Sequence, residues 1–129
     1  MHFHHVFEIE TTLFQGVAPR PDGFNEMIGG DELAAWLHAA LVEKGLNCGE
    51  PYAEDHGWDF EIRHEGGRYL VVCSCEFETE GEATDWHAVQ VAHLKGEPIE
   101  PDPVLGLVRD VLVAEPAITI TADEAKRRR

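Results

Sequence analysis

Basic residues are scarce in this sequence. Among its 129 residues there are 10 Lys and Arg against 25 Asp and Glu, which gives a formal net charge of −15. Four of the ten basic residues form the C-terminal run at 126–129, so the rest of the chain is more acidic still. A field of this sign repels nucleic acid and anionic lipid and speeds encounter with basic proteins. We therefore expect no nucleic-acid or membrane partner, and a basic protein partner instead.

Cysteines and long hydrophobic runs are also few. The three cysteines, Cys48, Cys73 and Cys75, are too few and odd in number for a disulfide scaffold, which favours a reducing compartment. No stretch approaches the roughly 18 apolar residues that a membrane helix needs. The N-terminus lacks the basic segment and apolar run of a secretory signal. These absences predict a cytoplasmic protein.

Two helices are predicted from apolar residues at helical spacing. The first begins at Asp31, and Gly45 lies where a left-handed C-terminal cap belongs. The second has Asp102 as its N-cap and Pro103 at its first position, where the missing N–H costs nothing. Pro116 ends it.

Strands are predicted where polar and apolar residues alternate or β-branched residues gather. These runs are residues 3–14, 58–65, 68–77, 86–94 and 117–121. With the helices they give the order β-α-β-β-β-α-β, which is typical of an antiparallel sheet with both helices packed on one face. The sequence therefore predicts a single α+β domain with about five strands over residues 1–125, followed by a disordered basic tail at 126–129.

The turn between the two central strands decides which side chains share a face. With Gly66-Gly67 as a two-residue turn, Phe60 faces Cys73 and Trp58 faces Cys75 on the apolar side. A free cysteine on such a face behaves as a small apolar residue rather than a metal ligand. The opposite side is mostly polar and carries Asp59, Glu61, Arg63, Leu70, Val72 and Ser74.

Leu70 and Val72 interrupt this polar side. A second copy of the chain would cover them in a two-fold homodimer, and the long connection at 16–30 would cover them within one chain. The sequence favours neither arrangement.

The segment from Glu54 to Trp58 is the most distinctive part of the chain. Glu54, Asp55 and His56 could supply a general acid and base. The same segment could instead be a partner-contact loop, or a turn in which Asp55 and Gly57 only shape the backbone. The sequence contains no nucleophile elbow, no phosphate-binding glycine loop and no His-Glu-x-x-His motif, and we predict no cofactor.

The N-terminal histidines are the candidates for a metal site. On a strand, His2 and His4 share one face at roughly 6.5 to 7 Å, a tolerable spacing for two ligands. A frayed terminus is the competing interpretation, and we predict no native metal.

Two short motifs frame the central part of the chain. Gly29-Gly30-Asp31 opens the first helix, with Trp36 and Leu37 following, and Glu54-Asp55-x-Gly57-Trp58 stands at the head of a strand. Over about residues 24–77 this pattern resembles a group of small bacterial proteins that have no assigned activity. The resemblance implies a bacterial cytoplasmic α+β domain and transfers no catalytic residue.

Taken together, these features predict a non-catalytic acidic protein that binds a basic protein partner, as an immunity-like, regulatory or chaperone-like protein does. The residues expected to bind the partner are Glu54, Asp55, Trp58, Asp59, Glu61, Glu76 and Glu78. The alternative is a small hydrolase or isomerase that uses Glu54, Asp55 and His56.

Overall fold

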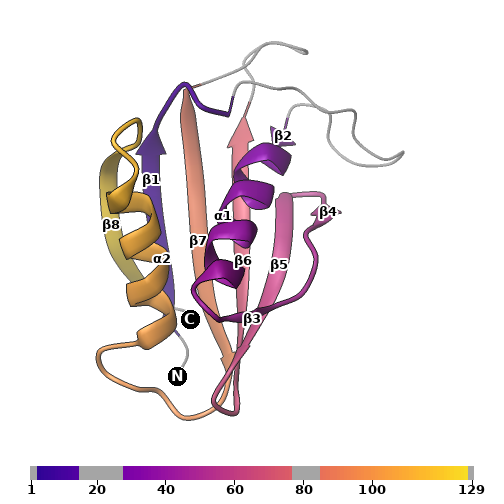
Figure 1. Cartoon of the computed structure of the whole chain (residues 1–129), viewed down its shortest axis with the longest axis vertical. Coiled ribbons are helices and arrows are strands. Elements are labelled where there is room, and N and C mark those ends of the chain that lie inside the picture. Colours follow the sequence, from indigo (N-terminus) through magenta and orange to yellow (C-terminus); the bar gives the residue numbers. More distant parts are fainter. Residues whose placement is uncertain (1–2, 15–27, 77–84, 128–129) are drawn as a thin grey trace.

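Residues 3–14, 28–76 and 85–127 are described by a computed structural model, which has two helices lying on one face of an antiparallel sheet (Figure 1). This confirms the predicted α+β class. The elements are β1 (Phe3–Glu10), β2 (Ile28–Gly29), α1 (Asp31–Glu43), β3 (Asn47–Cys48), β4 (Tyr52–Glu54), β5 (Gly57–His64), β6 (Gly67–Glu76), β7 (Trp86–Lys95), α2 (Pro103–Ala114) and β8 (Thr119–Arg127).

The described strands pair in the order β3-β5-β6-β7-β1-β8, with β2 paired to β6 and β4 paired to β5. All of these pairs are antiparallel. The described part therefore has eight strands, and the predicted number of about five is too low. The additional strands are β2, β3 and β4, which have two or three residues each and are too short to show a period-two pattern.

The last strand is longer than predicted. In β8, Lys126 pairs with His4 and Arg127 pairs with Phe3 across β1. The prediction that the domain ends at residue 125 and a disordered tail follows is therefore wrong for Lys126 and Arg127, which belong to the sheet. Main-chain pairing needs no apolar side chain, so a basic segment can extend an edge strand without a hydrophobic signal in its sequence.

Both helices begin and end as their capping residues predict. Gly45 follows α1 with φ 94, and Asp102 caps α2 by accepting hydrogen bonds from the backbone N–H groups of Val104 at 2.9 Å and Leu105 at 3.2 Å. The buried sides of the helices pack on the sheet to form the core. Its largest fully buried side chains include Phe7, Ile9, Leu33, Leu37, Leu41, Phe60, Ile62 and Leu112.

The β5–β6 hairpin lies two residues away from its predicted register. Its turn is Glu65-Gly66, with φ 47 and 78, so Phe60 pairs with Val71 and Trp58 with Cys73. Gly67 lies in β6 instead, and its Cα is so close to Gly96 that a Cβ on Gly96 would approach it to 2.8 Å. A shift of two residues keeps each side chain on its predicted face, and Cys73 and Cys75 are buried as predicted.

Two glycines from the sequence motifs meet at one point of β6. A Cβ on Gly30 would lie 2.4 Å from the carbonyl oxygen of Cys73, and a Cβ on Gly57 would lie 2.5 Å from the same oxygen. Their φ angles, 133 and 153, also disfavour other residues. The two motifs therefore have a shared structural role, since each lets its segment pack directly against the backbone of β6.

Candidate functional site

The sheet face turned away from α1 and α2, which we call the open face, has an apolar centre and charged sides. Cross-strand partners share a face, so the pairing gives its rows directly. One row runs from β4 to β8 as Tyr52, Asp59, Val72, Gln90, Val6 and Glu124. The next runs from β5 to β8 as Glu61, Leu70, Ala92, His4 and Lys126. Leu70 and Val72 thus lie near the middle of this face and are half-buried in the single chain.

Carboxylates gather where β4 and β5 form one side of the open face. Tyr52 is 42% exposed there. Partial burial raises the pKa of the Tyr52 hydroxyl, and the negative charges of Asp59, Glu61 and Glu54 raise it further. The charges of the three carboxylates are therefore felt at the hydroxyl of one exposed residue. We call the set Tyr52, Glu54, Asp59 and Glu61 the acidic edge.

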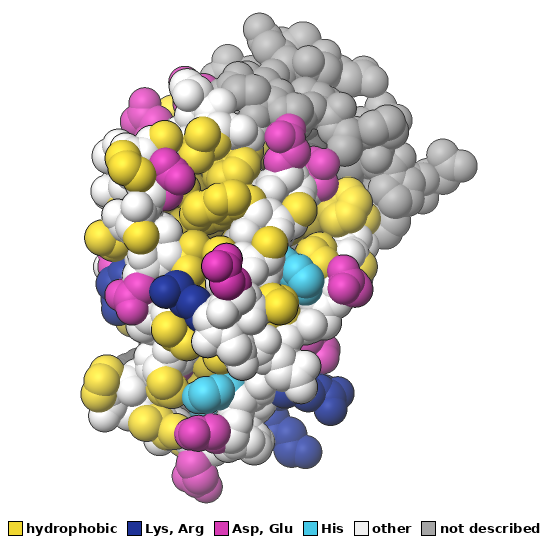
Figure 2. All heavy atoms as spheres, in the orientation of Figure 1, with side chains coloured by type: hydrophobic (Ala, Val, Ile, Leu, Met, Phe, Trp, Pro, Cys, Tyr) yellow, Lys and Arg dark blue, Asp and Glu magenta, His cyan; other side chains and the backbone are white. Residues whose placement is uncertain are grey.

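Acidic side chains also occur far from this set. Figure 2 shows the face covered by the helices, where they are scattered among apolar side chains. Acidic side chains thus lie on both faces of the described part of the chain, and the acidic edge groups three of them beside the exposed Tyr52.

Asp59 lies on the predicted polar side of the hairpin and was expected to bind the partner, but its side chain is buried at 2% exposure. β4 pairs alongside it, and His56 lies over its carboxylate, with Nε2 at 3.0 Å from Oδ1 and 2.9 Å from Oδ2. Burial raises the pKa of Asp59, although the hydrogen bond from His56 acts in the opposite direction. Asp59 therefore holds the His56 imidazole in place, while the His56 side chain itself is 57% exposed.

The other predicted binding residues do not all join the acidic edge. Asp55 and His56 form the turn between β4 and β5, since Glu54 pairs with Gly57. Trp58 points to the opposite side of the sheet and packs, half-buried, against the core. The side chain of Glu76 and the whole of Glu78 lie outside the described residues.

Of the two candidate metal ligands, only His4 lies within the described residues. His4 lies on the open face between Ala92 and Lys126, and His2 falls outside the described residues. Within residues 3–14, 28–76 and 85–127, no group of three or more His, Cys, Asp or Glu side chains is placed to hold a metal ion.

The His56–Asp59 pair has the geometry of an oriented general base. Proton transfer also needs a bound substrate within hydrogen-bond reach of the imidazole. Three cavities found in the described part of the chain are lined by other residues than Glu54, Asp55 and His56.

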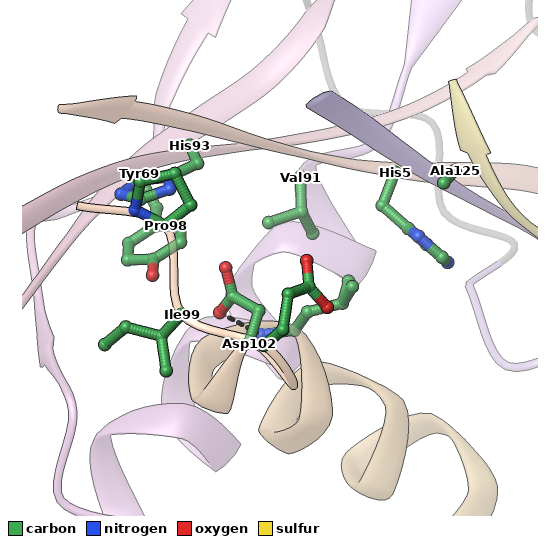
Figure 3. A pocket seen from close by; sticks show the side chains of 10 residues that line it. His5, Tyr69, Val91, His93, Pro98, Ile99, Asp102 and Ala125 are labelled. Carbon is green, nitrogen blue, oxygen red and sulfur yellow. Dashed lines mark hydrogen bonds between the residues drawn. The ribbon is translucent and has the colours of Figure 1, made fainter. Parts of the chain in front are cut away.

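Sequence reasoning missed a cavity of about 350 Å³ beside the start of α2. Figure 3 shows Tyr69 and His93 on one side of it, His5 and Ala125 on the other, and Asp102 pointing in from the helix start. The Tyr69 and His93 rings stack at 4.5 Å and 11°. Burial, followed by the charge and hydrogen bond of Asp102, raises the pKa of Tyr69 to about 12.

His5, which lines the cavity, belongs to a polar network with Arg109 and Asp123. Arg109 of α2 donates from Nε to Asp123 Oδ2 at 2.7 Å and from Nη2 to Oδ1 at 3.0 Å, and His5 Nε2 also bonds to Asp123. The hydrogen bond from Arg109 contributes most to lowering the pKa of Asp123 to about 2. The network ties α2, β1 and β8 together, and His5 Nε2 is engaged by Asp123.

Comparison with known proteins gives no assignment, because no family model, curated protein or solved structure matches the chain. Among the described residues, neither helix is long and apolar enough to cross a membrane. The function must therefore be inferred from the chain's own residues.

Proposed function

We propose that this chain is a non-catalytic acidic protein that binds a basic protein partner through the acidic edge and the adjoining open face. The observation that carries the proposal is that the register places Tyr52, Glu54 and Glu61 on one sheet face around the buried Asp59, with Tyr52 42% exposed. Carboxylates pair with Lys and Arg, and a tyrosine ring also attracts their cationic groups. Tyrosine is among the residues that contribute most to protein interfaces.

The open face supports the same proposal by its layout. Leu70 and Val72, near its middle, supply apolar contact area, and the acidic edge adds charge at one side. An apolar centre with a polar rim is the usual anatomy of a protein interface. One competing occupant is a second copy of the chain, but each copy carries a net charge of −15 and the two would repel each other. The other is the connection at 16–30, most of which lies outside the described residues.

In this proposal the protein acts in the cytoplasm, where the partner is an immunity target, a regulated protein or a chaperone client. These three roles share one physical requirement, which is recognition of a basic surface without chemistry on it. The charge complementarity also predicts fast, salt-sensitive association.

A titration with octalysine, with octaglutamate as the control peptide, tests the proposal directly. The informative variant is Glu54→Gln/Glu61→Gln. Its matched control is Glu65→Gln/Glu97→Gln, which removes the same charge from two exposed residues outside the acidic edge. Binding is measured by fluorescence anisotropy at about 0.1 M and about 1 M salt, where the Debye length is about 10 Å and about 3 Å.

We expect octalysine to bind the wild type and the control variant at the lower salt concentration, and to bind the Glu54→Gln/Glu61→Gln variant several-fold more weakly. We also expect binding to be lost at the higher salt concentration. Equal weakening in the two variants would mean that only the overall charge matters, and the acidic edge would lose its role.

A further inference from the structure

We propose that the cavity beside the start of α2 binds a small amphipathic amine, a molecule with an aromatic or branched aliphatic body and one ammonium group. This site is separate from the proposed partner surface, because no residue of the acidic edge lines the cavity. The inference therefore goes beyond the proposed function and does not depend on it.

The size and walls of the cavity fit a small organic molecule. A volume of about 350 Å³ lies at the lower end of the range for ligand pockets. Val91, Ile99 and Leu105 give it apolar walls. The stacked pair of Tyr69 and His93 adds a flat aromatic wall, against which a ring can pack (Figure 3).

The charged residues that line the cavity favour a ligand of positive charge. Glu100 and Asp102 are its acidic groups, and among the described residues that line it there is no Lys or Arg. An anion bound here would face both carboxylates within a chain of net charge −15. An ammonium group is favoured by the same field, and it can approach the face of the Tyr69 ring.

The helix start does not offer a competing anion site. The N–H groups of Val104 and Leu105, which would otherwise attract an anion, already donate to Asp102 Oδ1. Asp102 also accepts the hydrogen bond of the Tyr69 hydroxyl. Asp102 is thus fixed in place as part of the wall, and Glu100, which is exposed, is the carboxylate able to move onto an ammonium group.

Three probes of one shape test the site: phenethylamine, 3-phenylpropionate and 2-phenylethanol. Each is titrated into the full-length ¹⁵N-labelled protein, and backbone amide shifts are followed. We expect phenethylamine to shift Val91, Ile99 and Ala125 in a saturable way, 2-phenylethanol to do so more weakly, and 3-phenylpropionate to leave them unchanged. Shifts confined to other surfaces, or equal binding of the carboxylate probe, would overturn the inference.

Two matched pairs of variants locate the binding. Leu105→Trp fills the cavity, whereas Leu107→Trp adds the same bulk to a partly buried α2 residue that does not line it. Phenethylamine binding should be lost in the first variant and kept in the second. Glu100→Gln should weaken binding about threefold, as expected for one exposed charge contact, while Glu97→Gln should leave it unchanged.

The comparison of Glu100→Gln with Glu97→Gln still tests the inference if Leu105→Trp does not fold. Equal affinities in Glu100→Gln and Glu97→Gln would show that the cavity does not select an ammonium group, and the inference would then fail. Failure here would leave octalysine binding at the acidic edge intact, so the two proposals can be judged separately.

Discussion

Tyr52 and Asp59 lie directly opposite each other on β4 and β5. The tyrosine ring is 42% exposed while the carboxylate is 2% exposed, so one cross-strand pair joins an accessible aromatic group to a buried charge. His56 holds that carboxylate from the turn between the two strands. The acidic edge is thus built on a hydrogen-bonded frame, which favours recognition with little rearrangement.

Removing the aromatic ring should weaken partner binding with little effect on folding. We expect Tyr52→Ala to reduce affinity by about tenfold or more, the loss typical of an interface hot spot. Tyr52→Phe should retain most of the affinity, because the ring and its face remain. Dissociation constants for the basic partner, together with thermal melting of each variant, measure the two effects separately. Equal affinity in Tyr52→Ala would exclude the ring from the contact.

The buried carboxylate should make stability depend on pH. Burial raises the pKa of Asp59 above 3.8, so the native state holds this proton more tightly than the unfolded chain. This contribution to the free energy of unfolding is present below pH 3.8 and is lost as pH rises through the folded pKa. Asp59→Asn should remove this pH dependence of the free energy of unfolding. The variant should also be more stable than the wild type at pH 7, because it buries no ionised carboxylate and keeps an oxygen acceptor for His56.

The free energy of unfolding, measured in urea at a series of pH values, checks this prediction. Asp110→Asn, a change at an exposed residue, is the control. A wild-type curve and an Asp59→Asn curve of the same shape would contradict it.

A second pH dependence is expected at alkaline pH. The pKa of Tyr69 is about 12 against an ordinary value of 10.0, so stability should fall as pH rises from 10.0 toward 12. Tyr69→Phe should flatten this fall. Asp102→Asn should lower the pKa of Tyr69 while keeping α2 capped, because asparagine is also a good N-cap. An ultraviolet titration of the tyrosines measures the shift, and a Tyr69 that titrated at 10.0 would contradict the expectation.

The two glycines against Cys73 should tolerate no side chain. Gly30→Ala and Gly57→Ala should each lower the free energy of unfolding by about 2 to 3 kcal/mol, through backbone strain and contact with the Cys73 carbonyl oxygen. Gly106→Ala is the control, because a Cβ there meets nothing within 4 Å, and it should raise stability by about 0.5 to 1 kcal/mol within α2. Chemical denaturation measures all three, and similar values for the three variants would be inconsistent with this packing.

The parts of the fold that carry a local signal were predictable from sequence. Asp102 and Gly45 mark helix ends through their own side chain or backbone freedom, and alternating residues mark β1, β5, β6 and β7. The short strands β2, β3 and β4 have no such signal, because pairing with neighbouring strands defines them. The hairpin register was misjudged because Glu65 takes a positive φ in the turn, a position for which the sequence offered the glycine pair Gly66-Gly67.

The candidate site was predictable in part. Glu54, Asp59 and Glu61 were expected together, since their spacing places them on one strand face and the turn before it. The burial of Asp59 depends on β4 and His56 packing over it, which no local pattern reports. The cavity beside α2 was missed because His5, Tyr69 and His93 come from β1, β6 and β7, and they become neighbours only through the strand order.

The most direct test of partner binding is affinity capture from a lysate of the source organism with three baits. These are the wild type, the Glu54→Gln/Glu61→Gln variant and the Glu65→Gln/Glu97→Gln control, each washed at about 0.1 M salt, where surface charges still interact over about 10 Å. We predict that one basic protein is retained by the wild type and the control and is lost from the acidic-edge variant. Retention of the same proteins by all three baits, or of none by the wild type, would contradict the proposed function.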